Sequence, residues 1–534
     1  MINIELVQQA IQLIQQGKSN EGESLINKIL EENPQEIPLM STIGSLYLRL
    51  NKPEKAKKYI LMAYNTQKNI NTTLSLATYS MSQKDYVNAA IKFEEALSFN
   101  EDKKIYDILI SCLTKTQQKF KRHKIAERFY KTFPKDELAT FHYASALTDI
   151  GDFINAEFMV ANFLQNNPKS GKLWSQLGIL KELIYCDYQQ AYECYKQANE
   201  CGEIDTILDM AICQTKLGNY KEAENLFETA LKNNHNINNI LFSYGTCELF
   251  QRKFYEGFEK ITQRIPNETE ICYGLTNIYQ KGDNYNNDCY VICDQGYGDH
   301  LQFIRYLPAL KEKFGDFKVA TPKELQKLFS LNYPDIEFLD FKNFKKNQQA
   351  IRITDLPYIL DLDFDNIPFS EGYLDTPPAE IKSDKFKVGI CWLAGGTGLR
   401  GPIHRSVNLK NLDPILKIEN IQFYSLQFGD NSNEIEGYSH VIDLGKDFKS
   451  FYDTACAIKA MDAIICVDTS LLHLSGALGT KTLLLLPKSA DWRWFNENKK
   501  TEWYNSVEIF KQTDNISWEK PIRNLICRLK ELSS

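Results

Sequence analysis

The feature that most constrains this chain is a pattern that recurs through its first half. A turn is followed by an aromatic or apolar residue and then by a small residue, which we expect to open the second helix of a helix pair. The steps between adjacent small residues are 33, 35, 32 and 34 residues, at Ala56, Ala89, Ala156, Ala191, Ala223 and Gly257. The longer gap from Ala89 to Ala156 is expected to hold two degenerate units, one covering a helical run around Ala126. One such unit cannot bury its own apolar face, so successive units must stack.

This pattern resembles the tetratricopeptide repeat (TPR), whose unit is about 34 residues long. The similarity runs from Ile4 to Ile265, and Gly44, Gly178 and Gly245 occupy matching upstream positions. We predict an array of about seven units over residues 1–270, wound into a superhelix with a concave groove. The groove is expected to hold an extended peptide or another protein. The alternative is an array that only dimerises or stiffens the chain.

From about Asn284 the periodicity changes, and short apolar runs alternate with helical ones. Such alternation predicts parallel sheets built from strand–helix–strand units. One series contains Tyr290–Asp294, Phe317–Thr321, Ile336–Asp340 and Tyr358–Leu360; the other contains Phe386–Trp392, Ile421–Gln427, His440–Leu444, Ala463–Val467 and Thr482–Leu486. A polar stretch separates them, so we predict two Rossmann-like lobes, 284–378 and 384–534, closed by a C-terminal helix at Trp518–Leu532.

Composition excludes several classes of protein. The chain has 534 residues and a net charge of −7, which argues against a broad nucleic-acid-binding surface but leaves room for a local basic pocket. Its first residues lack the features of a signal peptide, and no apolar run is long enough for a transmembrane segment. The 13 cysteines show no metal-ligand spacing. We therefore predict a cytoplasmic protein without a metal site.

The first lobe opens with a strand, a glycine-rich turn and a helix. Gly296 and Gly298 allow a tight turn and close approach of a ligand, but Leu301 breaks the dinucleotide fingerprint GxGxxG. Asp299 follows at the helix start. It is either a carboxylate that stabilises the helix N-terminus or a general base directed into a cleft between the two predicted lobes. Pro308 is expected to kink this helix, and Arg305 is expected to face solvent.

The second lobe opens with a strand and a loop that carries four glycines, Arg400, His404 and Arg405. Guanidinium groups match phosphate oxygens, so this loop is either a diphosphate-binding element or a flexible surface loop with solvated arginines. Gln427, at the end of another strand, is placed to read the edge of a base or sugar.

The stretch from Ala463 to Trp494 reads as strand, turn, helix and strand. Asp468, Thr469 and Ser470 lie where the helix begins, and free N–H groups there favour anions. His473 lies four residues after Thr469, on the same helix face, and is either a ligand-binding group or a packed helix residue.

Five segments together resemble bacterial TPR-fused glycosyltransferases with a heptosyltransferase-like catalytic domain. They are GYGDHLQFIRYLPAL, RS followed by NLKNLDPIL, SLQFG, VDTSLLHLSGALG and LLLLPKSADWRWF. More distantly, the architecture resembles that of O-GlcNAc transferases. The resemblance implies a GT-B fold and an inverting, metal-independent sugar transfer. It implies Asp299 as the base and a donor site bordered by Asp468, Thr469 and His473. This chain has no lysine in its glycine-rich second-lobe loop, which leaves phosphate neutralisation to Arg400 or Arg405.

We therefore hypothesise an α-helical TPR superhelix followed by a two-lobed α/β transferase that uses a nucleotide-sugar donor. Asp299 would be catalytic, with Gly296, Gly298, Arg400, Arg405, Gln427, Asp468, Thr469, Ser470 and His473 around the donor. The acceptor would be a polypeptide held by the array, such as a flagellin or surface protein. Alternatives are transfer to lipopolysaccharide or another glycan, and a TPR scaffold whose transferase part is inactive.

Overall fold

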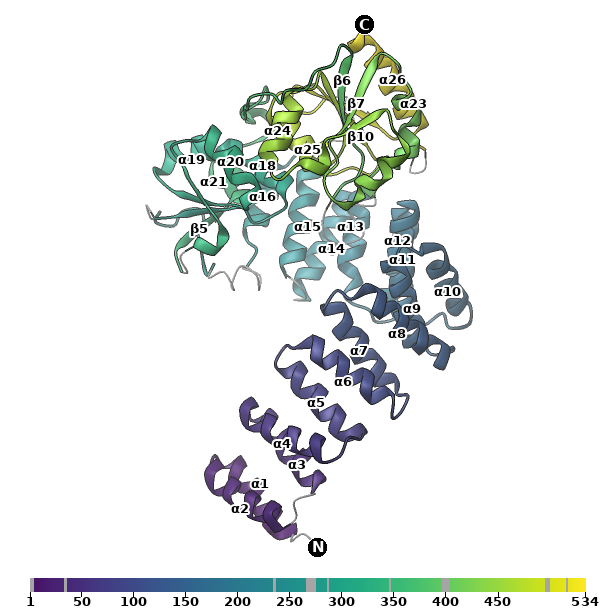
Figure 1. Ribbon diagram of the computed structural model, residues 1–534, viewed down its shortest axis with the longest axis vertical. Coiled ribbons are helices and arrows are strands. Elements are labelled where there is room, and N and C mark those ends of the chain that lie inside the picture. Colours follow the sequence, from purple (N-terminus) through teal and green to yellow (C-terminus); the bar gives the residue numbers. More distant parts are fainter. Residues whose placement is uncertain are drawn as a thin grey trace. The chain divides into compact units, whose positions relative to one another are not determined.

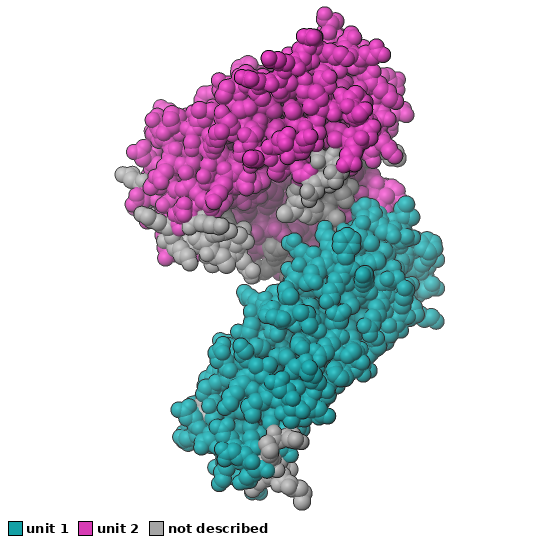
Figure 2. All heavy atoms as spheres, in the orientation of Figure 1, with its two compact units in different colours: residues 1–180 teal, residues 181–534 magenta. Residues whose placement is uncertain are grey.

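The computed structural model describes residues 4–32, 36–233, 237–265, 275–285, 288–344, 347–395, 404–494, 500–514 and 517–534. It forms two compact units, Met1–Leu180 and Lys181–Ser534 (Figure 2). The first unit is helical, whereas the second holds the last helices of the array and two parallel sheets. The predicted domain limits at 270, 284, 378 and 384 stay predictions.

Helices occupy the described residues from Ile4 to Thr262, in a long TPR-like array (Figure 1). Most helices that are consecutive along the chain pack against one another. The helices are α1 (Ile4–Gln15), α2 (Ser19–Glu32), α3 (Ile37–Arg49), α4 (Pro53–Thr66), α5 (Ile70–Ser82), α6 (Tyr86–Leu97), α7 (Lys103–Lys115), α8 (Lys119–Thr132), α9 (Glu137–Asp149), α10 (Phe153–Asn166), α11 (Gly171–Tyr185), α12 (Tyr188–Glu200), α13 (Thr206–Leu217), α14 (Tyr220–Lys232), α15 (Ile237–Phe250) and α16 (Phe254–Thr262).

The spacing of the repeat is more regular when it is measured between the turns inside the helix pairs than between the small residues. One residue in each turn has a positive φ, between 47° and 86°, at Gly17, Asn51, Lys84, Gln117, Gly151, Cys186, Gly218 and Arg252. Their spacings are 34, 33, 33, 34, 35, 32 and 34 residues. In three of these turns an aspartate follows and caps the next helix, as Asp85 does by accepting the backbone N–H of Asn88. The described residues thus hold eight such turns, where about seven units were predicted.

Arg122 explains why the repeat is hard to recognise between Ala89 and Ala156. This gap contains one further turn, at Gln117, and so one unit rather than the two that were expected. Arg122 follows that turn where the other units have Ala or Gly. Arg122 is buried, with its guanidinium paired to Asp149 and donating to Ser145 Oγ at 2.6 Å. The expected helical run around Ala126 is confirmed as part of α8.

The first sheet is parallel, with strand order β1-β5-β2-β3-β4. Helices α18 (Tyr297–Phe303), α19 (Leu307–Phe314), α20 (Lys323–Asn332) and α21 (Leu356–Ile359) connect or flank its strands. The strands are β1 (Asn277–Ile278), β2 (Tyr290–Ile292), β3 (Lys318–Ala320), β4 (Glu337–Leu339) and β5 (Gln349–Arg352).

The second sheet is also parallel, with strand order β11-β10-β9-β6-β7-β8. The order reverses between β6 and β9, as it does in doubly wound sheets. Its strands are β6 (Phe386–Cys391), β7 (Ile421–Ser425), β8 (Val441–Asp443), β9 (Ala463–Val467), β10 (Thr482–Leu486) and β11 (Val507–Lys511). Its helices are α23 (Asp413–Leu416), α24 (Phe451–Lys459), α25 (Ser470–Ala477) and α26 (Glu519–Ser533).

Both faces of the second sheet are buried at its central strands, which accounts for the continuous apolar runs of β9 and β10. On β9, Ile464 and Cys466 pack in a cluster with residues of α24 and α25. Ile465 and Val467 point the other way, into a cluster with α23 and α26. Figure 1 shows the two helix pairs on opposite sides of the sheet.

The last helix of the array belongs to the core of the second unit. Phe258 of α16 packs edge-on against Phe303 and Trp492, with ring centroids 5.8 and 5.9 Å away. Phe303 belongs to the first lobe and Trp492 to the second, so α16 joins both lobes in one apolar cluster.

Most predicted elements of the α/β part are confirmed within two residues of their limits. The strand predicted at Tyr358–Leu360 is wrong, because this segment ends a short helix that begins with Leu356-Pro357. Strands β1, β5 and β11 were not predicted. Pro308 does interrupt the helix: α18 gives way to a 3-10 turn, and Pro308 lies in the first turn of α19. Among the described residues, no helix combines the length and apolar composition needed to cross a membrane.

Candidate functional site

In open parallel sheets, ligand crevices lie beyond the carboxyl ends of strands where the strand order reverses. In the second sheet this point falls between β6 and β9. Arg405 bridges it, because Nη1 donates to the carbonyl of Asp468 at 3.1 Å and Nη2 to the carbonyl of Gly395 at 3.2 Å. The predicted residues Arg405 and Asp468 are therefore adjacent at the strand ends.

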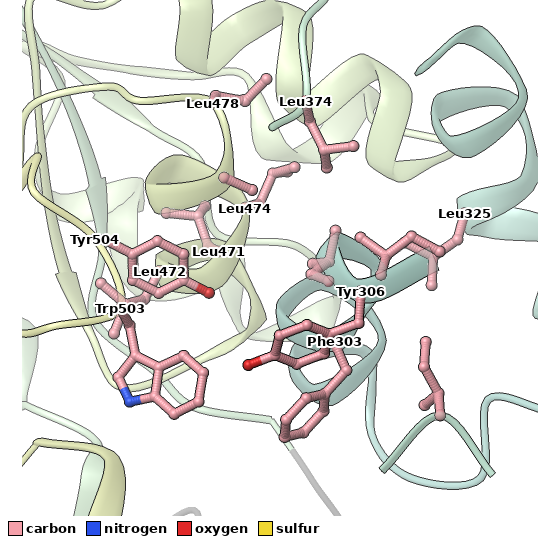
Figure 3. Packing of buried hydrophobic residues seen from close by; sticks show 14 of the residues in the cluster. Phe303, Tyr306, Leu325, Leu374, Leu471, Leu472, Leu474, Leu478, Trp503 and Tyr504 are labelled. Carbon is pink, nitrogen blue, oxygen red and sulfur yellow. The ribbon is translucent and has the colours of Figure 1, made fainter. Parts of the chain in front are cut away.

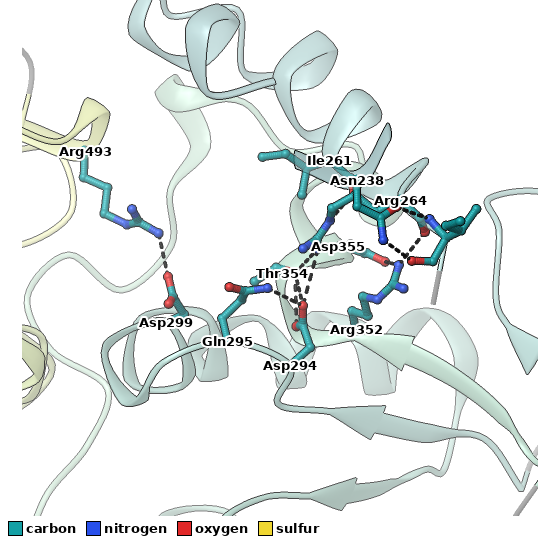
Figure 4. A network of polar contacts seen from close by, with 11 residues as sticks. Asn238, Ile261, Arg264, Asp294, Gln295, Asp299, Arg352, Thr354, Asp355 and Arg493 are labelled. Carbon is teal, nitrogen blue, oxygen red and sulfur yellow. Dashed lines mark hydrogen bonds and ion pairs between the residues drawn. The ribbon is translucent and has the colours of Figure 1, made fainter. Parts of the chain in front are cut away.

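In the first sheet the corresponding point lies between β2 and β5, and it is occupied by a polar network (Figure 4). Thr354, after β5, donates to both carboxylate oxygens of Asp294, after β2, at 3.1 Å. Arg264, just beyond α16, approaches Asp294 at 3.4 Å. These groups satisfy one another, so this crevice is filled by side chains and by the end of the array.

The carboxyl ends of the two sheets come together where α18 of the first lobe packs on α25 of the second. We call this contact between α18 and α25 the junction. Gly298 makes the contact possible, because a Cβ atom there would lie 2.9 Å from Cδ2 of His473 and 3.8 Å from Cα of Ser470. His473 is held in place by Tyr504, whose hydroxyl lies 3.0 Å from Nδ1. Leucines of α25 and the aromatic residues Phe303 and Tyr306 flank this junction (Figure 3).

Asp299 faces this junction from the first turn of α18, and its carboxylate accepts a hydrogen bond from Arg493 Nη2 at 2.6 Å. Arg493 comes from the second lobe and also donates to Asp491 at 2.8 Å and to Gln302 at 2.6 Å. Figure 4 shows the Arg493 guanidinium reaching across to Asp299. The Asp299 side chain is 27% exposed, so it remains accessible from solvent.

Burial sets the protonation states around the junction. It raises the pKa of Asp299, an effect that the Arg493 guanidinium opposes and that Asp294 and Asp491 reinforce. It raises the pKa of Asp468 to about 6, again with Asp491 adding and Arg405 opposing. Burial and the nearby Arg493 hold the pKa of His473 well below its usual value, so this ring is neutral. The junction therefore contains two carboxyl groups of raised basicity.

Thr469 is the N-cap residue of α25, with extended backbone, and Ser470 begins the helix. Within this described segment the Thr469 hydroxyl makes no capping hydrogen bond. The Leu472 N–H donates to the Thr469 carbonyl at 3.0 Å, so the N–H groups of Ser470 and Leu471 are the ones at the helix start that can meet a ligand.

The structure brings together only part of the predicted set. Gly298 lies against Ser470 and His473. Gly296 and Asp299 belong to the same turn as Gly298, and Thr469, Asp468 and Arg405 adjoin on the other side. Gln427 lies elsewhere on the strand ends, and its amide oxygen accepts the backbone N–H of Leu393 at 3.0 Å. It thus joins the ends of β6 and β7. Arg400 lies outside the described residues.

Arg305 was predicted to face solvent, and this prediction is wrong. It is fully buried and donates to the carbonyl groups of Gln302, Pro368 and Trp503 and to the Tyr373 hydroxyl, at 2.9–3.2 Å. Tyr504 and Tyr373 pack against its guanidinium.

Sequence reasoning missed Arg493, Asp491 and Tyr504, which complete the junction. The only signal was that Arg493 lies in the segment LLLLPKSADWRWF, immediately after an apolar strand. Nothing in that segment indicates a partner in the other lobe.

No protein-family model matches the sequence, and no curated protein matches it. The solved structures similar to this chain include helical-repeat proteins. YrrB, a TPR protein with an unusual peptide-binding site, is 18% identical with a TM-score of 0.28, over 33% of this chain and 91% of YrrB. A thermophilic TPR protein of Thermus thermophilus is 18% identical with a TM-score of 0.30, over 34% and 99%. A TPR protein from Parabacteroides merdae is 14% identical with a TM-score of 0.35, over 45% and 96%.

Proposed function

We propose that this protein is an inverting glycosyltransferase of GT-B architecture that moves a sugar from a nucleotide-sugar donor to an acceptor hydroxyl. One observation carries the proposal. Asp299 lies in the first turn of α18, at the carboxyl end of one parallel sheet, and the adjacent Gly298 packs on Ser470 and His473 of α25, at the carboxyl end of the other. A base on one side and an anion-binding helix start on the other are what such a transfer requires.

In this proposal Asp299 removes the proton from the acceptor hydroxyl. The acceptor oxygen then bonds to the anomeric carbon, while the bond from that carbon to the diphosphate oxygen breaks and its electron pair leaves with the diphosphate. A carboxylate whose pKa is raised by burial is a better base than a solvated one. Arg493 fixes the orientation of Asp299 by a single hydrogen bond from Nη2.

Negative charge on the departing diphosphate is stabilised from the second lobe. The N–H groups at the start of α25 are directed toward the strand ends, and Arg405 lies beside them on the carbonyl of Asp468. The resemblance to metal-independent transferases supports this assignment.

The array supports a polypeptide as the acceptor. Repeat arrays present extended surfaces for other proteins. In the first unit several large apolar side chains are exposed, among them Val87 (51%), Phe120 (81%), Ile154 (78%) and Phe158 (67%). The alternatives are an acceptor on lipopolysaccharide or another glycan, and a scaffold with an inactive transferase part.

Incubation of the full chain with a panel of nucleotide sugars, followed by measurement of the released nucleoside diphosphate, tests the proposed activity. We expect slow release of the nucleoside diphosphate from one donor by hydrolysis. An extract containing the acceptor should accelerate this release, because the sugar is then transferred. Absence of turnover with every donor, with and without extract, would leave the scaffold alternative.

A further inference from the structure

A cavity of about 870 Å³ lies between the end of the array and the second lobe, inside the second unit. One side is formed by the end of α11, the start of α12 and the end of α13. The other is formed by residues that follow or end β10 and β11, among them Lys488 and Lys511. These are the carboxyl ends of parallel strands, where ligands of such sheets bind. Pockets for small molecules are of this size, roughly 300–1,000 Å³.

Four lysines line this lysine pocket, two from each side: Lys181, Lys216, Lys488 and Lys511. Asp187 is the one acidic residue among the described residues that line it, and it caps α12 by accepting the backbone N–H of Gln190 at 2.9 Å. Burial, helped by Lys216 and Lys488, lowers the pKa of Lys511 to about 8. Lys216 also has the carboxylates of Asp491, Glu182 and Asp468 among its charged neighbours. The lining of the pocket itself carries more basic than acidic side chains, which suits an anionic ligand.

Two tyrosines, Tyr185 and Tyr188, also line the lysine pocket. Tyr185 is 45% exposed, and Lys181 Nζ lies 5.2 Å from the centre of its ring. An exposed ring beside ammonium groups suits a ligand that joins an aromatic ring to an anionic group. Cys186 Sγ lies 3.0 Å from Nδ1 of His404, and burial raises the pKa of the Cys186 thiol to about 11.

The lysine pocket is connected to the junction of the two lobes. Lys216 Nζ donates to the carbonyl of Ala490 at 3.0 Å. The next residue, Asp491, is paired with Arg493, which in turn is bonded to Asp299. A ligand held by Lys216 would thus lie beside the chain segment that positions Asp299.

We propose that the lysine pocket binds a nucleoside diphosphate, with the phosphates among the four lysines and the base against Tyr185. The array then contributes to a small-molecule site through Lys181 and Lys216, in addition to any role in binding protein. This inference rests on the proposed function only in taking the ligand to be the leaving group of the donor. It adds lysines of two distant segments to Arg405 and the start of α25 in neutralising the diphosphate. Asp468, whose carbonyl accepts a hydrogen bond from Arg405, is among the charged neighbours of Lys216.

Isothermal titration calorimetry of the full chain with ADP, GDP, UDP and inorganic pyrophosphate tests the inference. We expect the double substitution Lys488→Gln, Lys511→Gln to weaken binding of the preferred diphosphate by about tenfold or more. Lys511→Arg should retain most of the affinity because the charge is kept. Lys520→Gln, an exposed lysine of α26 outside the pocket, should bind as the wild type does. Tyr185→Ala should weaken the nucleotide but not pyrophosphate.

Wild-type affinity in the double variant would overturn the inference, as would failure of the wild type to bind any of the four probes. Binding through the lysines without turnover of any nucleotide sugar would uphold the pocket and contradict the proposed function. Turnover with an unchanged donor KM in the double variant would contradict the pocket alone.

Discussion

Arg305 illustrates how a buried charge holds separate segments together. Its guanidinium bonds to the chain at Gln302, to Pro368 in the segment between the lobes and to Trp503 in the second lobe. Removing it leaves several buried oxygen atoms without a donor, and each such loss costs about 1–3 kcal/mol. This cluster is therefore a structural anchor of the second unit rather than part of the chemistry.

We expect Arg305→Met to lower the free energy of unfolding of the second unit by about 3 kcal/mol or more. Urea denaturation followed by tryptophan fluorescence measures this, because Trp392, Trp492, Trp494, Trp503 and Trp518 all lie in that unit. Arg523→Met, at an exposed position of α26, is the matched control. An Arg305 variant as stable as this control would refute the anchoring role.

Asp468 gives a prediction about pH. Its pKa in the folded protein is raised to about 6, so folding favours the protonated carboxyl. Its contribution to stability is therefore complete below about pH 4 and is lost as pH rises through about 6. Asp468→Asn removes this loss, and we expect the variant to exceed the wild type by about 1–3 kcal/mol at pH 8.

Thermal unfolding of both proteins between pH 4 and 8 measures the effect, with exposed Asp335→Asn as the control. The stability difference between Asp468→Asn and wild type should shrink as pH falls from 8 to 4. A difference that is independent of pH would mean that the Asp468 carboxyl is not held at a raised pKa.

At the level of single residues, the sequence predicted some positions correctly and could not predict others. Thr469 and Ser470 were placed correctly at the start of a helix because a polar turn follows an apolar strand. The burial of Arg305 and the pairing of Arg493 could not be predicted, since their partners are backbone carbonyls or side chains far away in sequence.

At the scale of elements, the contact between α18 and α25 depends on the absence of a side chain at Gly298. We expect Gly298→Ala to destabilise the second unit by about 1–3 kcal/mol, because the added Cβ overlaps the buried His473 ring. Gly296→Ala in the same turn is the control. Its Cβ would meet only Asp299 Oδ2, at an ordinary 3.6 Å. Denaturant midpoints that shift equally for both variants would disprove the close packing of the two helices.

Elements were predicted best where both faces of a strand are buried. Strands β9 and β10 read as continuous apolar runs and were found at their full length. The edge strands β1 and β11 carry polar or charged residues, such as Glu508, which bonds to Arg528 at 2.9 Å. Such strands give little signal because their pattern resembles that of loops.

At the scale of the whole molecule, repeat spacing predicted the array and alternating patterns predicted two sheets. The sequence did not indicate that the last repeats would share a compact unit with the α/β part. It also showed no sign of the lysine pocket, because Lys216 and Lys511 belong to segments far apart in the chain. Sites of this kind appear only when distant segments are folded together.

The central claim is that Asp299 acts as the base in a sugar transfer. The most direct test compares wild type, Asp299→Asn and the exposed control Asp316→Asn in donor affinity and in transfer rate at saturating donor. We expect Asp299→Asn to bind the donor within about threefold of wild type while transfer falls by a factor of about 100 or more. Transfer at the wild-type rate by Asp299→Asn would contradict the claim.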